Sequence, residues 1–317
     1  MKPRYGSVKG NGLFLVADPH VAANPPGQRL NSYCADILDK IEACLKESAK
    51  RGLVPVFLGD LFHWPRENPN KLLVDLIELF RDYRPFILVG NHDKYQARFT
   101  SDVSLAVLEV AGVIRLMNEP GEQFILQTDQ GNALIGAAPD GFPIPKSYER
   151  EEGLVSVLWL THHNIAFPDY EKPHYSIKDI PGIDWVINGH IHRPKDTVKK
   201  GSTTWANPGN ITRMVFCRGA LEKIPQASIW KPGIDDLEKW TVPHKDFYDV
   251  FPDQDFPPEE AQVPLSESGF LRGLERLAWK RTSEGAGLKQ FLTENLNPED
   301  PESDLIWKLY KEVTNAE

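Results

Sequence analysis

Five short segments of this 317-residue chain carry aspartate, asparagine or histidine residues of the kind that bind metal ions. The segments are Asp18-Pro19-His20, Gly59-Asp60, Gly90-Asn91-His92-Asp93, Thr161-His162-His163 and Gly189-His190-Ile191-His192. Each follows an apolar run of the kind that forms a buried strand. Side chains at the tips of adjacent strands can converge on one point. The sequence therefore predicts one polar site that these segments build together.

The ligands that these segments offer are oxygen and imidazole groups, without thiolates. Such ligands suit Mn²⁺, Fe²⁺ or Zn²⁺, whereas an iron–sulfur cluster or a cysteine-type zinc site needs cysteine. Asp18 and His20 are spaced i, i+2, which points both side chains the same way from an extended backbone, and His190 and His192 repeat this spacing. Two such pairs, a shared carboxylate and further single ligands are enough for two metal ions roughly 3.5–4 Å apart, a centre that can activate water for phosphoryl displacement.

Each segment alone has an ordinary structural explanation. Asp-x-His and Gly-x-His-x-His stretches are commonly turns or satisfied polar clusters, and Gly59-Asp60 alone is a common end of a strand. That explanation also holds for four single histidines: His63, His163, His174 and His244. All five segments in this order, each after a strand, are hard to explain by structure alone, so we interpret them as a functional site.

Strands and helices alternate in the first half of the chain. We expect helices over about 28–51, 70–83 and 102–111, the second beginning at Asn68-Pro69 as an N-cap and first helical residue. The resulting βαβαβα order predicts parallel strands joined by right-handed crossovers.

The middle of the chain is richer in strands. Further strands are predicted at 123–127, 133–137, 203–206, 227–230 and 240–242. The first two flank a turn at Asp129-Gln130-Gly131 and suggest a hairpin. We expect two packed sheets with helices outside, and two long loops, 139–151 and 165–182, at the rim of the site.

Composition changes near Asp249, which predicts three regions. Residues 1–248 are the expected catalytic domain, 249–266 form a linker rich in proline and acidic residues, and 267–317 contain helical patterns.

The overall composition limits the setting of the protein. A net charge of −9 means that any DNA binding must come from a local groove, bound metal ions or a partner. Cys34, Cys44 and Cys217 form no CxxC pair, which fits a reduced, cytoplasmic compartment. No apolar run approaches the roughly 18–20 residues of a membrane span, and Asp18 leaves no room for a signal peptide before it, so we expect no membrane association.

The ordered segments resemble the calcineurin-like metallophosphoesterases, whose pattern is DxH, GD, GNHD, a histidine after a strand, and GHxH. The match spans about 13–213. The resemblance implies an α/β fold, a two-sheet metallophosphoesterase sandwich flanked by helices, here with a short helical C-terminal tail. It also implies two divalent metal ions, with Mn²⁺ expected and Fe²⁺ or Zn²⁺ as alternatives.

The resemblance also assigns metal ligands, position by position. One ion would be held by Asp18, His20, Asp60 and His192, and the other by Asp60, Asn91, His162 and His190. Asp60 would bridge the two ions. His162 is preferred over His163 because the ligand of this family is usually the first residue after the strand.

The same resemblance gives roles to two residues that are not ligands. His92 would be the acid that protonates the leaving oxygen or stabilises the pentacoordinate transition state, and Asp93 would orient it.

Two stretches are similar to SbcD-like DNA repair nucleases. Gly59-Asp60-Leu61-Phe62-His63, followed by Pro65-Arg66, resembles their GDLFH stretch, and 207–213 resembles their YPGS-like segment. Asn210 stands where serine is usual, and the region after the catalytic core is short. The leading hypothesis is a Mn²⁺-dependent DNA nuclease, exo- or endonucleolytic, similar to the SbcD subunit of an SbcC–SbcD complex. A small-molecule phosphodiesterase or a phosphomonoesterase is the alternative, and a non-enzymatic scaffold is a third possibility, although no ligand is missing.

The resemblance also suggests partners. The helix over 70–83 is apolar on more than one face, which fits a homodimer or deep burial. Two apolar helical patterns lie within 267–317. They could bind an SbcC-like SMC-family ATPase, as in SbcD-like nucleases, or pack on the core.

Overall fold

The computed structural model describes residues 3–170, 173–252, 303 and 306–308. The described residues up to 252, apart from 95–98, belong to one compact unit, and the features below are those of this unit.

A six-stranded mixed sheet carries the first three polar segments. Its strands, in spatial order, are β13 (Glu238–Thr241), β12 (Gln226–Trp230), β2 (Leu13–Val16), β3 (Val54–Phe57), β4 (Phe86–Leu88) and β5 (Arg115–Met117). From β2 to β5 all neighbours are parallel, as the alternation of strands and helices predicts. β12 and β13 extend the sheet in antiparallel pairing.

A seven-stranded sheet carries the other two polar segments. Its strands, in spatial order, are β1 (Ser7–Lys9), β6 (Gly121–Thr128), β7 (Gly131–Ala138), β8 (Leu154–Thr161), β9 (Trp185–Asn188), β11 (Thr203–Asn207) and β10 (Lys195–Lys200). β6 and β7 form the predicted hairpin, and β7, β8, β9 and β11 are parallel.

The two sheets pack face to face through fully buried side chains. Leu15, Val56 and Leu88 of the first sheet share a core with Phe124 and Leu158 of the second. Burial of each such side chain stabilises the fold by about 1.5–3 kcal/mol. This core fixes the strands of both sheets relative to one another, and with them the polar segments at their ends.

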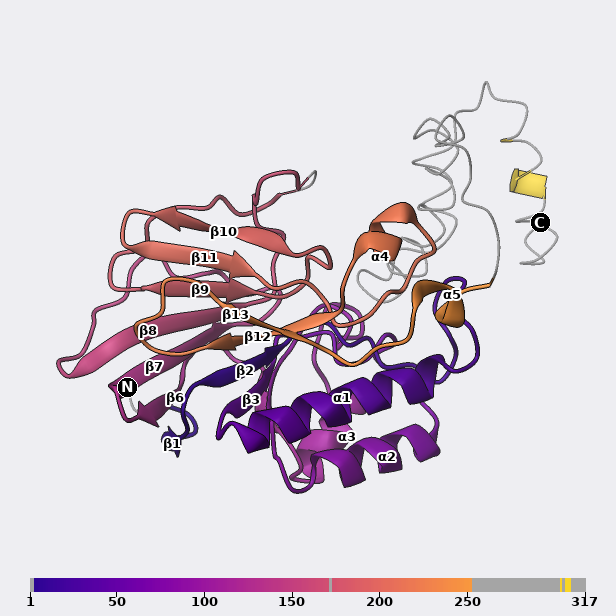
Figure 1. The fold of residues 1–317 in the computed structure, drawn as a ribbon, viewed down its shortest axis with the longest axis horizontal. Helices are drawn as coiled ribbons and strands as arrows, with labels where there is room; N and C mark the ends of the chain where they lie inside the picture. Colours follow the sequence, from indigo (N-terminus) through magenta and orange to yellow (C-terminus); the bar gives the residue numbers. More distant parts are fainter. Residues whose placement is uncertain (1–2, 171–172, 253–302, 304–305, 309–317) are drawn as a thin grey trace. The chain divides into compact units, whose positions relative to one another are not determined.

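Helices cover the outer face of the six-stranded sheet. Figure 1 shows α1 (Tyr33–Lys50), α2 (Asn70–Phe80) and α3 (Ser104–Val110) together beside β2 and β3. In α1, Ile37, Ile41, Cys44 and Leu45 recur at helical spacing and are buried against this sheet. Two further helices, α4 (Arg218–Glu222) and α5 (Phe247–Val250), are short.

The outer face of the seven-stranded sheet is covered by loops. Apolar residues of the connections, such as Ile144, Ile165 and Ile180, pack against Trp159 and Trp205 on this face. The predicted flanking helices α1, α2 and α3 therefore lie on the six-stranded sheet, and loops take their place on this face. The connections between β7 and β9 carry isolated apolar residues, and these suffice to bury the two tryptophans.

The start of α2 differs from the prediction. Pro69 precedes the first helical residue, and no side chain caps the helix. Asn68 donates instead to the carbonyl of Trp64 and to Ser104 Oγ, both at 2.9 Å, so it joins the start of α2 to the start of α3.

Several predictions remain without a test. α2 buries Leu72, Leu76 and Phe80, while Val74 is 48% exposed. Part of the apolar surface of this helix therefore faces outward, and the homodimer stays a prediction. Almost all of the predicted linker 249–266 and of the helical region 267–317 lies outside the described residues. Among the described helices, none is long and apolar enough to cross a membrane.

Candidate metal centre

The five polar segments lie at the ends of five strands. Asp18, Asp60 and Asn91 follow the neighbouring parallel strands β2, β3 and β4, and His162 and His190 follow the neighbouring parallel strands β8 and β9. Because the strands within each set run in the same direction, each set presents its polar residues at one edge of its sheet. Residues of one set contact residues of the other, as Asn91 contacts His162 and His190, so these strand ends of the two sheets meet.

The backbone turns sharply at four of the predicted ligands. Asp18, His20, Asp60 and His190 have φ angles of 45°, 51°, 50° and 70°. This left-handed region is costly for residues other than glycine and persists only where the surroundings enforce it. The extended backbone predicted for the two i, i+2 pairs is therefore wrong. A hydrogen bond from the His20 N–H to the Asp60 carbonyl, at 3.0 Å, helps to hold the first of these turns.

One set of donor atoms has the spacing of ligands around a single ion. Asp60 Oδ2 lies 3.2 Å from His162 Nε2, which lies 3.1 Å from Asn91 Oδ1, which lies 2.8 Å from His190 Nδ1. Ligands about 2.1 Å from an ion and at right angles to one another are about 3 Å apart. The four atoms therefore fit adjacent positions around one divalent cation.

A second set of donor atoms also lies near Asp60. His20 Nε2 lies 2.9 Å from His192 Nε2 and 3.7 Å from Asp60 Oδ2. Donor atoms of Asp18, His20 and His192 all lie within 4.8 Å of one another. Asp18 is fully buried, and its Oδ2 has no hydrogen-bond partner among the described residues. A buried carboxylate oxygen without a partner is costly, and a cation at this position would satisfy it.

The pKa values describe a crowded, buried set of charges. Burial raises the pKa of Asp18 to about 7 against the opposing charge of His162, and burial together with Asp60 raises the pKa of Asp93 to about 7. Burial acts to lower the pKa of His162, but the carboxylate of Asp60 outweighs it and raises this pKa to about 10. Burial lowers the pKa of His190 to about 4, so this imidazole is neutral and able to bind a metal. Close carboxylates and imidazoles fit divalent cations, and a bound cation would take the place of the His162 proton.

The glycines of the segments make room for the ligands. A Cβ at Gly90 would lie 2.2 Å from Asp60 Oδ1, and a Cβ at Gly59 would lie 2.3 Å from His162 Nδ1. Neither distance is possible without movement of a ligand. The ring of His162 is held further by its Nδ1, which lies 2.7 Å from the carbonyl of Leu58, and this contact leaves Nε2 as the ligand atom.

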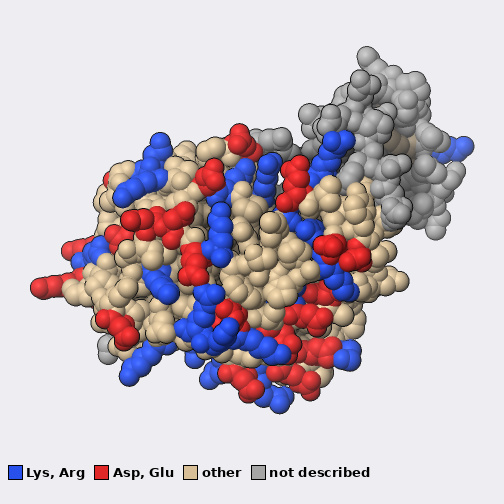
Figure 2. Space-filling model, in the orientation of Figure 1, with Lys and Arg blue, Asp and Glu red and all other residues tan. Residues whose placement is uncertain are grey.

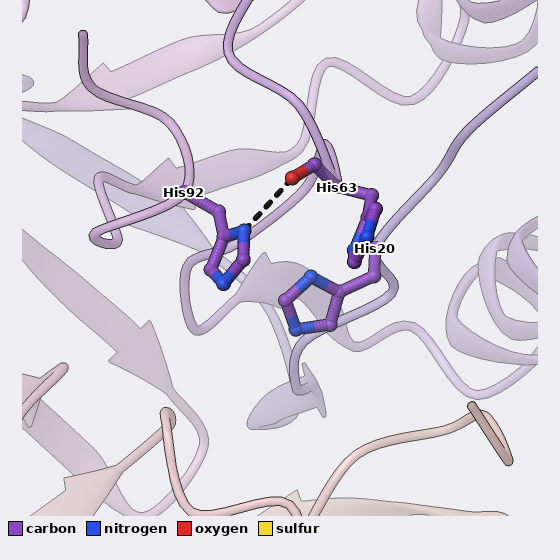
Figure 3. Close-up of side chains that lie close together, drawn as sticks. All are labelled: His20, His63 and His92. Carbon is purple, nitrogen blue, oxygen red and sulfur yellow. Dashed lines mark hydrogen bonds between the residues drawn. The ribbon is translucent and has the colours of Figure 1, made fainter. Parts of the chain in front are cut away.

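His92 lies close to His20 and His63, and a hydrogen bond joins its ring to the backbone of His63 (Figure 3). Its Nδ1 donates to the carbonyl of His63 at 2.8 Å, so the imidazolium form donates its other proton from Nε2. Its backbone N–H donates to Asp60 Oδ1 at 2.8 Å. Asp93 accepts from the N–H groups of Gly90 and Phe62, at 3.0 and 3.3 Å. The His63 carbonyl thus helps to orient the His92 ring, while the orienting role of Asp93 stays a prediction.

Two residues that the sequence did not assign to the site lie in it. The His63 ring stacks on the His92 ring with 5.5 Å between centroids, and it forms a group of potential ligands with His20 and His92. Asn164 Oδ1 lies 2.9 Å from His190 Nε2. His63 stands three residues after Asp60 and Asn164 two residues after His162, and this proximity is the signal that the sequence offers.

The histidine pair 162–163 divides its roles. His162 joins the ligand set, whereas His163 Nε2 lies 2.7 Å from the carbonyl of Phe142 and holds the loop after β7. His244 is also away from the ligand sets, with Nδ1 2.7 Å from the carbonyl of Val242.

Fold and site together define a two-sheet protein with a set of Asp, Asn and His ligands at adjacent strand ends. The family model that matches this chain is that of the calcineurin-like phosphoesterases, over residues 13–194, which is more than half of the chain. The protein belongs to this family and is a metal-dependent phosphoesterase. The members bind divalent metal ions, and the residues described above fit such ions. The match does not distinguish SbcD-like nucleases from other members.

Comparison with solved structures gives distant likenesses. The 5′-nucleotidase precursor of Thermus thermophilus is 11% identical, with a TM-score of 0.43, over 82% of this chain and 59% of that protein. The NAD nucleotidase of Haemophilus influenzae is 11% identical, with a TM-score of 0.44, over 96% of this chain and 60% of that protein. The sulfate thiohydrolase SoxB of Thermus thermophilus is 12% identical, with a TM-score of 0.37, over 75% and 55% of the two chains. This chain thus spans less than two thirds of these proteins, and no curated protein matches its sequence.

Proposed function

We propose that this protein is a two-metal phosphodiesterase that cleaves nucleotide phosphodiester bonds. The observation that carries the proposal is the position of Asp60. Its Oδ2 is within 3.2 Å of His162 Nε2 in one ligand set and within 3.7 Å of His20 Nε2 in the other, and its Oδ1 holds the backbone of His92. A phosphate placed over both ligand sets therefore lies beside an acid that can protonate a leaving group.

The residues divide the chemistry among them. Two divalent ions, held by Asp18, His20, Asp60 and His192 and by Asp60, Asn91, His162 and His190, would supply Lewis acidity and a nucleophile at neutral pH. The imidazolium of His92 donates its Nε2 proton to the departing oxygen, while the His63 carbonyl keeps the Nδ1 proton in place. Proton donation matters most for alkoxide leaving groups, which are poor without it.

The charges around the centre favour a diester over a monoester. A phosphomonoester carries nearly two negative charges at neutral pH and is usually clamped by Lys or Arg. Here Lys94 is paired with Asp140 at 2.5 Å, and Lys223 donates to the carbonyls of His192 and Thr212 at 3.1 and 2.9 Å. Both lysines are already engaged, and a singly charged diester needs less compensation.

A DNA nuclease is the more specific candidate for this diesterase. The nuclease-like stretch Gly59–His63 brings His63 into stacking contact with His92, so its last residue lies at the site of the chemistry. Lys, Arg, Asp and Glu are interspersed on the face shown in Figure 2, so DNA would be held locally and not by a uniformly basic surface. Mn²⁺, a second subunit and an SbcC-like ATPase belong to this candidate. A phosphodiesterase on small nucleotides is the alternative.

Purified protein assayed with Mn²⁺ tests the proposal. The substrates are bis-p-nitrophenyl phosphate, p-nitrophenyl phosphate, cyclic nucleotides, and labelled single- and double-stranded DNA, with the Asp60→Asn variant as the control for contamination. We expect diester hydrolysis that stops on chelation and in the variant. Hydrolysis of the monoester alone would contradict the diesterase, and hydrolysis of small diesters without DNA cleavage would remove the nuclease candidate.

A further inference from the structure

A cavity of about 570 Å³ opens directly beside one metal-ligand set. The exposed His192 lines it, and most of the other lining residues come from the segment that follows β11 and contains α4. Its volume is in the range of small-molecule sites, which are about 300–1,000 Å³. The proposed reaction uses His192 alone among these lining residues, so the rest of the cavity has no role in it.

Asn210 supplies the cavity with an unsatisfied polar group. It is 2% exposed, and its Oδ1 has no hydrogen-bond partner in the described part of the chain. Its Nδ2 makes only a weak contact, 3.9 Å long, with Met214 Sδ, and its backbone N–H donates to the His192 carbonyl at 3.1 Å. The side chain is thus tied to the metal ligand through the backbone, while its carboxamide is covered by one flexible methionine.

One part of the wall suits a flat group with apolar faces. Met214, Val215 and Ile224 line the cavity, and Val215 and Ile224 are 61% and 58% exposed. The wall is held in place before any ligand arrives. Arg213 donates to the carbonyls of Lys223 and Lys245, at distances of 2.9–3.1 Å. A preformed wall lowers the entropy that binding must overcome.

We propose that this cavity binds the nucleoside next to the scissile phosphate. The base lies against Met214, Val215 and Ile224, and its hydrogen-bonding edge meets the carboxamide of Asn210, which offers both a donor and an acceptor. The sugar then points to His192, and with it the phosphate to the metal ions. This assignment rests on the proposed diesterase and names the group that its substrate carries.

Binding without metal tests the cavity independently of activity. The chain has three methionines, of which Met117 is fully buried in the core and Met214 lines the cavity, so ¹³C-methyl labelling gives a probe and an internal control. In EDTA, thymidine 5′-monophosphate is expected to shift the Met214 signal saturably and leave Met117 unchanged. A short single-stranded oligonucleotide, as a second arm, separates a DNA end from a small nucleotide as the source of the nucleoside. No shift with either ligand at millimolar concentration would overturn the proposal.

Selectivity in turnover gives the second test. Wild-type protein is expected to prefer thymidine 5′-(p-nitrophenyl phosphate) to bis-p-nitrophenyl phosphate, and Asn210→Ala to lower this preference about tenfold through loss of a hydrogen bond. Ile224→Glu, on the exposed rim, should lower it as well without a risk to folding, and Asn132→Ala, on the surface at the start of β7, is the matched control. If neither substrate is cleaved, the proposed function fails. If both are cleaved and neither cavity variant changes the preference, the cavity assignment fails alone.

Discussion

Replacement of Gly90 by alanine should disable the centre through a displacement of Asp60. The added Cβ would lie 2.2 Å from Asp60 Oδ1, whereas ordinary contacts begin at 3.4 Å, so one of the two must move by about 1.2 Å. The backbone of Gly90 is not in the left-handed region, so alanine causes no backbone strain there. The Cβ would also lie 2.5 Å from the backbone nitrogen of Asp60, so the change displaces this residue as a whole.

The displacement is large on the scale of metal coordination. Ligand distances must hold within about 0.2 Å, and a misplacement of about 1 Å at a reacting group can cost about 100-fold in rate. We expect Gly90→Ala to lose at least one of two bound ions and to fall at least about 100-fold in diester hydrolysis.

Elemental analysis, near-ultraviolet circular dichroism and a diesterase assay on the same sample measure these effects. Gly219→Ala is the control for metal content, because a Cβ there meets nothing within 4 Å. A Gly90→Ala protein with two ions per chain and activity within threefold of wild type would refute the reasoning.

Two further predictions concern a proton donor and a buried lysine. His92→Ala should keep both ions, and its kcat/KM should fall more for diesters with alkoxide leaving groups than for p-nitrophenyl esters. Rate and metal content are measured on the same sample. Loss of the ions would make His92 a ligand instead. Lys40 is buried, and burial together with Arg29 and Arg213 lowers its pKa to about 7. Between about pH 7 and 10 this lysine is protonated in the unfolded chain but mostly neutral in the folded protein. Its burial therefore destabilises the fold fully below pH 7, and progressively less as the pH rises. The free energy of unfolding of wild type relative to Lys40→Met should therefore rise from pH 7 to pH 9, at up to about 1.4 kcal/mol per pH unit, in denaturant titrations; a difference independent of pH would contradict this.

The ligand residues could be predicted because each ends an apolar run. Residues that directly follow a strand lie at its carboxyl end, outside the packed core. His and Asp residues at these ends therefore have no packing role. The strands β2, β3, β4, β8 and β9 were therefore predictable together with the site, and the structure confirms these strands.

Elements without such a pattern escaped prediction. β10 has the sequence Lys-Asp-Thr-Val-Lys-Lys, which carries little apolar signal because it is an edge strand. β1 and β5 have three residues each, too few for a period to show. The loops on the outer face of the seven-stranded sheet bury single apolar residues without periodicity, and only the tertiary structure reveals their packing.

The details of the site depend on contacts between distant segments. The positive φ angles of Asp18 and His20, and the carbonyl of His63 that holds His92, follow from how the two sheets and their loops meet. Residue types alone predicted which side chains gather. They did not predict that His63 supplies a backbone acceptor, or that Asn164 reaches His190.

The central claim is that two ions share Asp60. Anomalous diffraction from crystals soaked in Mn²⁺ measures this directly. The predicted result is two peaks about 3.5–4 Å apart, with Asp60 between them, Asp18 and His192 on one ion and Asn91 and His190 on the other. A single peak, or two peaks without Asp60 between them, would contradict the account.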